Sequence, residues 1–169
     1  MKRRKPKNRS WSLLASLRPR WHAVRSRDDM IVRKAVPIVL RGDGDSTDIL
    51  VFEHPRAGTQ LVKGTIERGE SSSDAAVREL WEESGIVAER IVRDLGVWPS
   101  PKGPVWHFHE VLVEAVLPER WEHFTQDGGG KLFRFRWHRL AEEPSVTWHP
   151  IHRDALVFVR TALREVMRT

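Results

Sequence analysis

The chain has 169 residues and no cysteine, and its 29 Lys and Arg against 23 Asp and Glu give a net charge of +6. This length fits one domain with a short extension, and the lack of cysteine excludes disulfides, thiolate metal sites and cysteine nucleophiles. The composition suits a reducing cytoplasm, which is the compartment we expect. No apolar run reaches the ~18 residues of a membrane span, so we expect no membrane partner.

The positive charge is concentrated at the N-terminus. Residues 1–34 hold twelve Lys and Arg and two Asp, so they carry +10, and the remainder of the chain carries −4. We interpret residues 1–29 as a basic N-terminal extension and residues 30–169 as the folded domain. The extension could bind RNA through phosphate charge and through stacking on Trp11. A solubilising tail is the alternative.

From residue 30 onward, segments with strand and helix patterns alternate along the chain. β-Branched and apolar runs between turn-forming clusters predict strands over residues 30–40, 49–54, 60–64, 91–98, 105–117 and 131–140, the last as an edge strand. A helix is expected over 73–84, because the segment 71–74 offers N-cap side chains and Gly85 can end it. A second helix is expected over 152–167. The interleaving predicts an α/β or α+β domain.

The helix over 73–84 places three carboxylates on one face, those of Glu79, Glu82 and Glu83. We expect the opposite face to be buried, and it carries Val77, Leu80 and Trp81. Like charges at this spacing, near the C-terminal end of a helix, destabilise it. A divalent cation explains the arrangement, because Mg²⁺ and Mn²⁺ prefer carboxylate oxygens. A solvated acidic face is the alternative.

The residues around this helix extend the pattern. The stretch GTIERGESSSDAAVRELWEESGI, residues 64–86, resembles the Nudix box, the signature of the Nudix hydrolases. All nine fixed positions of that signature match, and here they are Gly64, Glu70, Arg78, Glu79, Leu80, Glu82, Glu83, Gly85 and Ile86. One departure is Val62, which stands where many members have proline. The strand pattern extends the likeness over residues 33–168.

The resemblance implies an α/β fold of the Nudix type, an α/β/α sandwich with a mixed sheet. It also implies hydrolysis of a diphosphate linkage in a nucleoside diphosphate joined to another group, with Mg²⁺ or Mn²⁺ as cofactor. On this basis Glu79 and Glu83 are the first metal ligands and Glu82 assists them. The backbone carbonyl of Lys63 is a further ligand. Glu79 is the first choice for the base that accepts a proton from water.

Three other positions of the box have supporting roles under the same resemblance. Arg78 and Glu70 would hold the loop and the helix together. Gly64 would let the backbone approach metal and phosphate closely, because glycine has no side chain to obstruct a ligand.

Four residues outside the box are further candidates. In some Nudix enzymes a loop acid near the last strand completes the metal site, and Asp127 or Glu110 could take that role here. Trp98 and Trp106 flank a proline-rich loop, where a base could stack on them. Surface acids and core tryptophans are the alternatives.

Two functions remain open. The first is a metal-dependent hydrolase of a small nucleotide, with nucleoside triphosphates, dinucleoside polyphosphates, ADP-ribose, nucleotide sugars and diphosphoinositol phosphates as possible substrates. The second is an RNA-binding protein, or an RNA 5′-end pyrophosphohydrolase, that uses its basic N-terminus. The complete set of box carboxylates favours the first.

Overall fold

The computed structural model describes residues 31–101, 103–126, 129–166 and 168. The basic extension over 1–29, its expected RNA binding and the candidate ligand Asp127 lie outside the described residues. In chain order the elements are β1 (Arg33–Arg41), a 3-10 turn η2 (Gly44–Ser46), β2 (Asp48–His54), β3 (Gly58–Gln60), β4 (Gly64–Thr65), α1 (Ser72–Ser84), β5 (Arg90–Pro99), β6 (Val105–Leu112), β7 (Arg120–Thr125), β8 (Lys131–Arg139) and α2 (Pro150–Val166).

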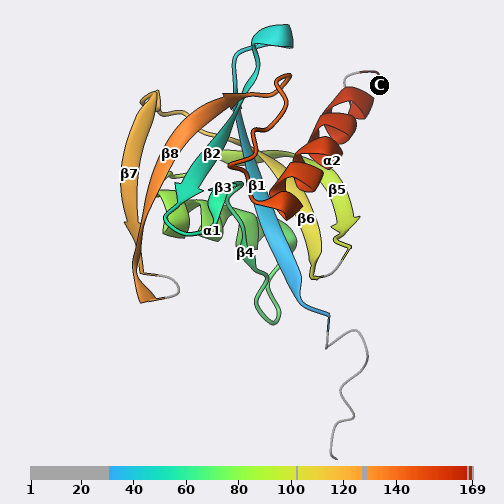
Figure 1. Ribbon diagram of the computed structural model, residues 1–169. Helices are drawn as coiled ribbons and strands as arrows, with labels where there is room; N and C mark the ends of the chain where they lie inside the picture. The colour runs from blue at the N-terminus through green and yellow to red at the C-terminus, as the bar shows by residue number, and fades with distance from the viewer. Residues whose placement is uncertain (1–30, 102, 127–128, 167, 169) are drawn as a thin grey trace, which may run out of the picture.

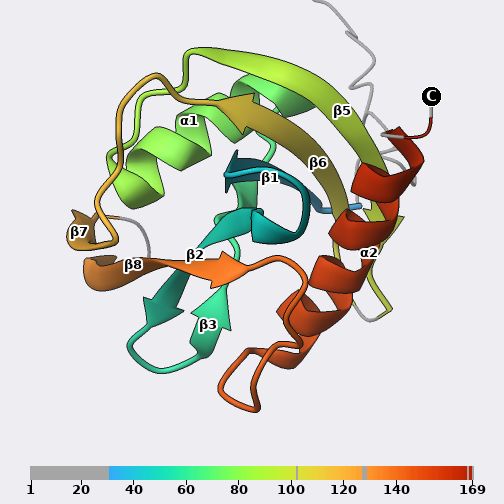
Figure 2. The ribbon, with the colours of Figure 1, turned by 90° about the horizontal axis from the view of Figure 1, so that it is seen from above.

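The strands form one mixed sheet in the order β5-β6-β1-β2-β8-β7, with β3 paired to β2 and β4 to β1 (Figure 2). The β1–β6 pair is parallel and the other pairs are antiparallel. Strand β8 lies between β2 and β7, so the expectation of an edge strand at 131–140 is wrong. Its polar and apolar alternation arises because an inner antiparallel strand can also have one solvated face. The edge strand on this side of the sheet is β7, which the sequence patterns did not predict.

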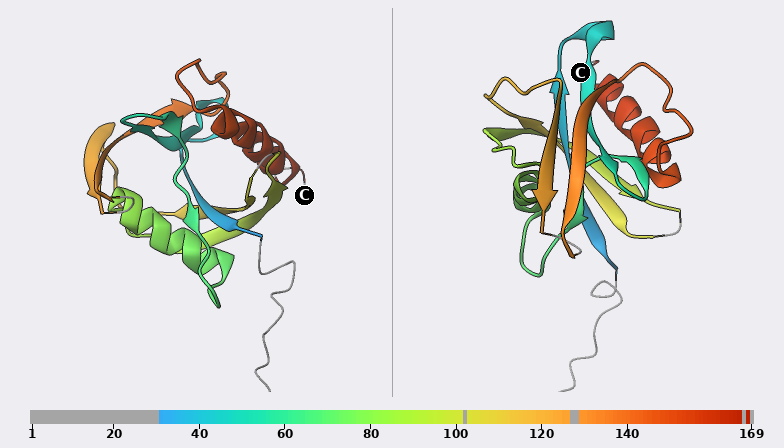
Figure 3. Two further views of the ribbon diagram at one scale, coloured as in Figure 1. Left: turned by 60° about the horizontal axis from the view of Figure 1, so that its bottom comes forward. Right: turned by 60° about the vertical axis from the view of Figure 1, so that its left-hand side comes forward.

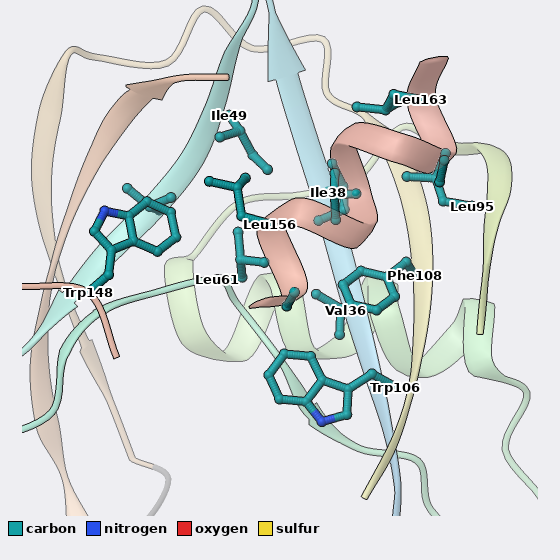
Figure 4. Close-up of a cluster of buried hydrophobic side chains, with 14 residues drawn as sticks. Val36, Ile38, Ile49, Leu61, Leu95, Trp106, Phe108, Trp148, Leu156 and Leu163 are labelled. Carbon is teal, nitrogen blue, oxygen red and sulfur yellow. The ribbon is translucent and has the colours of Figure 1, made fainter. Parts of the chain in front are cut away.

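The two helices lie on opposite sides of the central strands β1 and β2 (Figure 3). Alternate residues of β1 point to the two sides, so Val36 and Ile38 pack with α2, whereas Ala35 packs with α1. Figure 4 shows the α2 side, where Leu156 and the indole of Trp106 join Val36 and Ile38. This arrangement confirms the expected α/β/α sandwich.

Helix α1 begins and ends as its sequence predicts. Ser71 is the N-cap, and its Oγ accepts a hydrogen bond of 3.0 Å from the Asp74 N–H. Gly85 has a φ of 74°, and its N–H donates to the Trp81 carbonyl at 2.8 Å. This left-handed conformation suits glycine.

The buried face of α1 is different from the one expected. Its buried residues are Ala75, Ala76, Glu79, Leu80, Glu83 and Ser84. Val77 and Trp81 are exposed, so the prediction that they pack in the core is wrong. The reason is that small side chains, Ala75 and Ala76 against Ala35 of β1, let the helix lie close to the sheet. The carboxylate face therefore turns inward and Trp81 turns to solvent.

Two strand boundaries also differ from the expectation. The strand expected over 60–64 is divided into β3 and β4, and residues 61–63 between them belong to no strand. The strand expected over 105–117 ends at Leu112. No described helix is both long and apolar enough to cross a membrane.

Candidate active site

A cleft of about 380 Å³ opens between α1 and the ends of β2, β4 and β8. Carboxylates from α1 form one wall of it, those of Glu79, Glu82 and Glu83. Cations from three other segments also line it, those of Lys34, Lys63 and Lys131. The cleft thus combines oxygen ligands for a metal ion with positive charge for an anion.

Arg78 connects the helix to the loop before it. Its Nε and Nη2 donate to the two carboxylate oxygens of Glu70, both at 2.9 Å, and Nη2 also donates to the Thr65 carbonyl at 3.0 Å. Its Nη1 donates to Glu79 at 2.8 Å and to Glu82 at 2.9 Å. One guanidinium therefore orients two of the cleft carboxylates and holds the loop against the helix.

The electrostatics of this network favour its charged form. The hydrogen bonds from Arg78, together with one from the Glu67 N–H at 2.9 Å, lower the pKa of the Glu70 carboxyl below its usual value. The hydrogen bonds to Glu70, Glu79 and Glu82 raise the pKa of the Arg78 guanidinium. The loop acid and the arginine consequently remain an ion pair at neutral pH.

The loop before β4 approaches the two buried carboxylates directly. A Cβ at Gly64 would lie 1.6 Å from Cδ of Glu79, so glycine at this position is what admits that carboxylate. The Lys63 N–H donates to Oε2 of Glu83 at 3.2 Å. Val62, in the place of the family's proline, is buried in the core with Leu80 of α1 and its neighbours, so packing holds the loop there.

The donor set fits a hard divalent cation. Glu79 and Glu83 are only 6% and 7% exposed, and both line the cleft. The ligand atoms that they offer to a metal ion are carboxylate oxygens. Among the described residues no three His, Asp or Glu side chains converge into a complete metal cage. Mg²⁺ does not require one, because it usually takes one or two carboxylates plus waters and substrate phosphates. The Lys63 carbonyl, from the loop whose N–H contacts Glu83, would be a further oxygen ligand.

The wall opposite the carboxylates contains an aromatic pair and a histidine. The rings of Phe52 and Phe133 stack with centroids 4.2 Å apart, and the His54 ring lies 5.5 Å from Phe133. His54 Nδ1 accepts from the Arg56 N–H at 3.1 Å, so the proton of the neutral ring is on Nε2. Burial, and then the positive charges of Lys131, Lys63 and Arg56, lower the pKa of His54, which favours that neutral form.

Sequence reasoning missed the contributions of His54, Lys34 and Lys131. His54 ends β2 and Lys131 begins β8, and the pairing of these two strands brings them to one end of the sheet. Lys34 is positioned by the β1–β4 pair, where its Nζ donates to Thr65 Oγ1 at 2.7 Å. No sequence spacing connects these residues, so only the sheet topology could identify them.

Three candidates from the sequence do not lie in this cleft. Trp106 is 1% exposed in the α2-side core and Trp98 packs against that core, which corrects the expectation that a base stacks on them. Glu110 pairs with Arg93 of β5 at 2.9 Å. It has the same strand parity as Trp106 and Phe108, so it points to the sheet face opposite α1. Glu110 is therefore not a ligand in this cleft.

The start of α2 fixes the loop that carries Lys63 and Gly64. The Leu61 N–H donates to Nδ1 of the buried His152 at 3.0 Å. The His149 N–H donates to the Thr59 carbonyl at 3.1 Å. Residues near the C-terminus thus determine where the cleft's backbone lies.

Comparison with known proteins places the chain in a family. The family model for the NUDIX domain matches residues 32–157. An RNA pyrophosphohydrolase of Cereibacter sphaeroides is 49% identical over 131 residues, which cover 70% of this chain and 76% of the relative. An ADP-ribose pyrophosphatase of Haemophilus influenzae is 29% identical over 94 residues, which cover 48% of this chain and 43% of the relative. The chain thus spans less than half of that second relative.

Solved structures share the fold at low sequence identity. The NUDIX domain of Shewanella oneidensis NrtR, solved with ADP ribose, has a TM-score of 0.58 at 15% identity, covering 79% of this chain and 88% of that one. An ADP-ribose pyrophosphatase from Streptococcus suis has a TM-score of 0.54 at 16% identity, covering 79% of this chain and 92% of that one. These likenesses concern the fold, and the family model together with the 49% identical relative shows that the chain belongs to the Nudix family.

Proposed function

We propose that this Nudix protein is a metal-dependent pyrophosphohydrolase that cleaves a diphosphate linkage in a nucleoside diphosphate joined to another group. The observation that carries the proposal is the cleft itself, in which buried carboxylates of α1 face lysines from three other segments. The family and the names of its relatives support hydrolysis of a pyrophosphate bond. Metal dependence and the nucleoside diphosphate substrate are the finer parts of the proposal.

Each group in the cleft has a role in this reaction. Glu79, Glu83 and the Lys63 carbonyl would hold Mg²⁺ or Mn²⁺, with Glu82 assisting at the rim. The cation, when bound, neutralises diphosphate charge and lowers the pKa of the attacking water. Glu79 is our first choice to accept the proton of that water. A new P–O bond forms to the water oxygen as the bridging P–O bond breaks.

The lysines and His54 would bind the diphosphate. Lys34, Lys63 and Lys131 place three cations around the cleft, which favours a densely anionic ligand. His54, neutral and with its proton on Nε2, can donate to a phosphate oxygen without losing a proton of its own. We therefore assign it to substrate positioning and not to proton abstraction.

A second candidate substrate is the 5′ end of RNA. The specific observation in its favour is the 49% identical relative named an RNA pyrophosphohydrolase. The chemistry at the cleft would be the same, and the basic residues 1–29 would add phosphate contacts. A cytoplasmic location, expected from the cysteine-free sequence, would give access to both substrate classes.

A hydrolysis screen that detects the nucleoside monophosphate, sugar phosphate and pyrophosphate products by ion-exchange chromatography tests the proposal. The panel contains nucleoside triphosphates, dinucleoside polyphosphates, ADP-ribose, nucleotide sugars and 5′-triphosphorylated RNA, each with Mg²⁺, with Mn²⁺ and with excess EDTA. We expect hydrolysis of at least one class with either metal ion, and its loss in EDTA. Full activity in EDTA would overturn the metal assignment. No turnover of any class with either metal would overturn the enzyme assignment.

A further inference from the structure

A second groove adjoins the catalytic cleft. It has a volume of about 550 Å³ and runs between α1 and the edge strand β7. Its lining residues are Trp81, Glu82, His123, Phe124, Thr125 and Gln126. Glu82 lines both the groove and the cleft, so the two spaces adjoin at a residue of the candidate metal site. The mechanism proposed above gives the groove no role.

The groove exposes large aromatic side chains. Trp81 is 59% exposed and Phe124 is 62% exposed, although both have more apolar surface than most residues. Trp81 and Glu82 line the same groove, so the exposed indole lies at an opening that adjoins the candidate metal site. An exposed apolar patch next to a functional site is typical of a ligand contact.

Contacts between β7 and the end of α1 hold the groove open in a defined shape. The His123 ring donates from Nε2 to the Glu82 carbonyl at 3.3 Å, and the Trp121 indole donates to the Ser84 carbonyl at 3.3 Å. A Cβ at Gly85 would lie 2.9 Å from Nδ1 of His123, so the helix end and the strand are in close contact. The position of Trp81 relative to β7 is therefore preorganised.

The charge of the lining indicates what the groove can hold. Among the described residues that line it, Glu82, at the boundary with the cleft, is the only acidic one, and the others offer aromatic rings, an imidazole, a hydroxyl and an amide. Such a lining disfavours phosphate or an acidic peptide and favours an uncharged, planar heterocycle. The cleft's three lysines lie in the adjoining space and suit the phosphates of the same molecule.

We propose that this groove is a nucleobase subsite, in which a base of the substrate stacks on Trp81 while its diphosphate lies in the cleft. The proposal rests on the proposed function, since it requires a nucleotide substrate. The base could belong to the nucleotide that carries the diphosphate or, in RNA, to the following nucleotide. Stacking of a base on an aromatic side chain contributes to binding without requiring a particular base.

The test compares Trp81→Ala and Trp81→Phe with the wild-type protein and with Val157→Ala, which removes another exposed apolar side chain, on α2. Each is assayed on the best nucleotide from the screen and on the matching ribose 5′-polyphosphate, which has no base. For Trp81→Ala we expect KM for the nucleotide to rise about tenfold or more, which is within the range of base stacking, with kcat nearly unchanged. The base-free substrate should be hydrolysed as by wild type, and Trp81→Phe and Val157→Ala should stay within about threefold of wild type.

Equal effects of Trp81→Ala on both substrates, or no effect on either, would overturn the subsite. A change of oligomeric state with unchanged KM would also overturn it, because the groove would then be an interface between copies.

Nucleoside triphosphate and 5′-triphosphorylated dinucleotide distinguish the two sources of the base. If the Trp81 effect is already present with the mononucleotide, the stacked base is that of the first nucleotide. If it appears only with the dinucleotide, the stacked base is that of the second.

Failure of the proposed function is separable from failure of this inference. If wild-type protein hydrolyses nothing, the function fails, and calorimetric titration with a non-hydrolysable nucleotide still tests the groove. Binding weakened about tenfold by Trp81→Ala would support the subsite. Equal binding by both proteins, or no binding by either, would overturn it.

Discussion

At the scale of single residues, the cleft depends on close contact between a loop and buried carboxylates. Glu79 and Glu83 share the inward face of α1 with alanine and leucine, although burial of a charged group is unfavourable unless it is paired. The Arg78 guanidinium and the Lys63 N–H supply part of that pairing. The unfavourable burial of these carboxylates beside cations supports the metal site that we propose.

Neutralising either buried carboxylate should abolish most turnover. We expect Glu79→Gln and Glu83→Gln each to lower kcat by about 100-fold or more, the order of magnitude seen when electrostatic stabilisation of a transition state is removed. Glutamine has nearly the same shape, so the melting temperature should stay close to that of wild type. Steady-state kinetics and thermal melts measure both quantities. Glu122→Gln, on the exposed part of β7, is the control, and near-normal turnover of the Glu83 variant would contradict its role as a ligand.

A methyl group at Gly64 should have a similar effect through geometry alone. The added Cβ of Gly64→Ala would occupy the space of the Glu79 carboxylate, so the carboxylate must move or the loop must shift. We expect kcat/KM to fall by about 100-fold or more, because catalysis depends on sub-ångström placement of ligands. Gly103→Ala, whose Cβ would meet only the Ser100 hydroxyl at 3.2 Å, is the control. Comparable activity of both variants would show that the cleft tolerates displacement of Glu79.

At the scale of elements, α2 positions the active site from the opposite layer of the sandwich. His152, near the start of α2, accepts the Leu61 N–H and is 1% exposed. Burial lowers the pKa of His152 to about 2, so the ring is neutral in the folded protein at every physiological pH. The unfolded chain takes up a proton at this residue near pH 6.5. Folding stability is therefore linked to pH through His152.

This linkage predicts acid sensitivity with a defined sign. Because the folded pKa lies below the unfolded one, the stabilisation is complete above pH 6.5 and is lost progressively as the pH falls towards the folded pKa of about 2. Between pH 7 and pH 5 His152 should remove about 2 kcal/mol from the free energy of unfolding. Urea titrations of wild type and His152→Gln at the two pH values measure it. The variant should be less stable than wild type at pH 7, but its free energy of unfolding should fall less between pH 7 and pH 5. Equal falls in the two proteins would contradict the lowered pKa of His152.

At the scale of the whole molecule, charge is divided between the domain and the residues before it. Residues 1–34 carry +10 and the rest of the chain carries −4. The described domain nevertheless gathers three lysines at its cleft, so an anionic substrate can bind without the N-terminal charges. The two charge distributions therefore suit two ligands, the diphosphate in the cleft and, in our second candidate function, an RNA chain outside it.

Deleting residues 1–27 separates these roles. The deletion removes ten Lys and Arg and no Asp or Glu, so the net charge falls from +6 to −4. We expect kcat/KM on a small nucleotide to stay within a few-fold, because every described cleft residue lies after residue 30. RNA affinity should weaken and lose much of its salt dependence, which follows the number of phosphates neutralised. The two proteins are compared by kinetics and by RNA binding at two salt concentrations.

Either of two results would change this view. Unchanged RNA affinity after the deletion would remove the nucleic-acid role of the extension. Loss of small-substrate turnover would instead show that the first residues contribute to the catalytic domain.

The family, the capped helix α1 and the identity of its carboxylates could all be predicted from the amino-acid sequence. These features are local: caps and helical spacing act over a few residues, and the Nudix box occupies a continuous stretch. The interleaved strands and helices indicated an α/β or α+β domain, and the resemblance to the Nudix hydrolases implied the sandwich.

Which faces and ends of those elements meet could be seen only in the folded chain. It turned Glu79 and Glu83 inward and Trp81 outward, because alanines at the contact let α1 lie close to β1. It placed Trp106 in the core and brought His54 and Lys131 together, because strand alternation and the pairing of β2 with β8 act between residues far apart in the chain. Helical periodicity groups side chains on a face but does not say which face meets the sheet. That choice depends on the shape of a partner encoded elsewhere in the sequence.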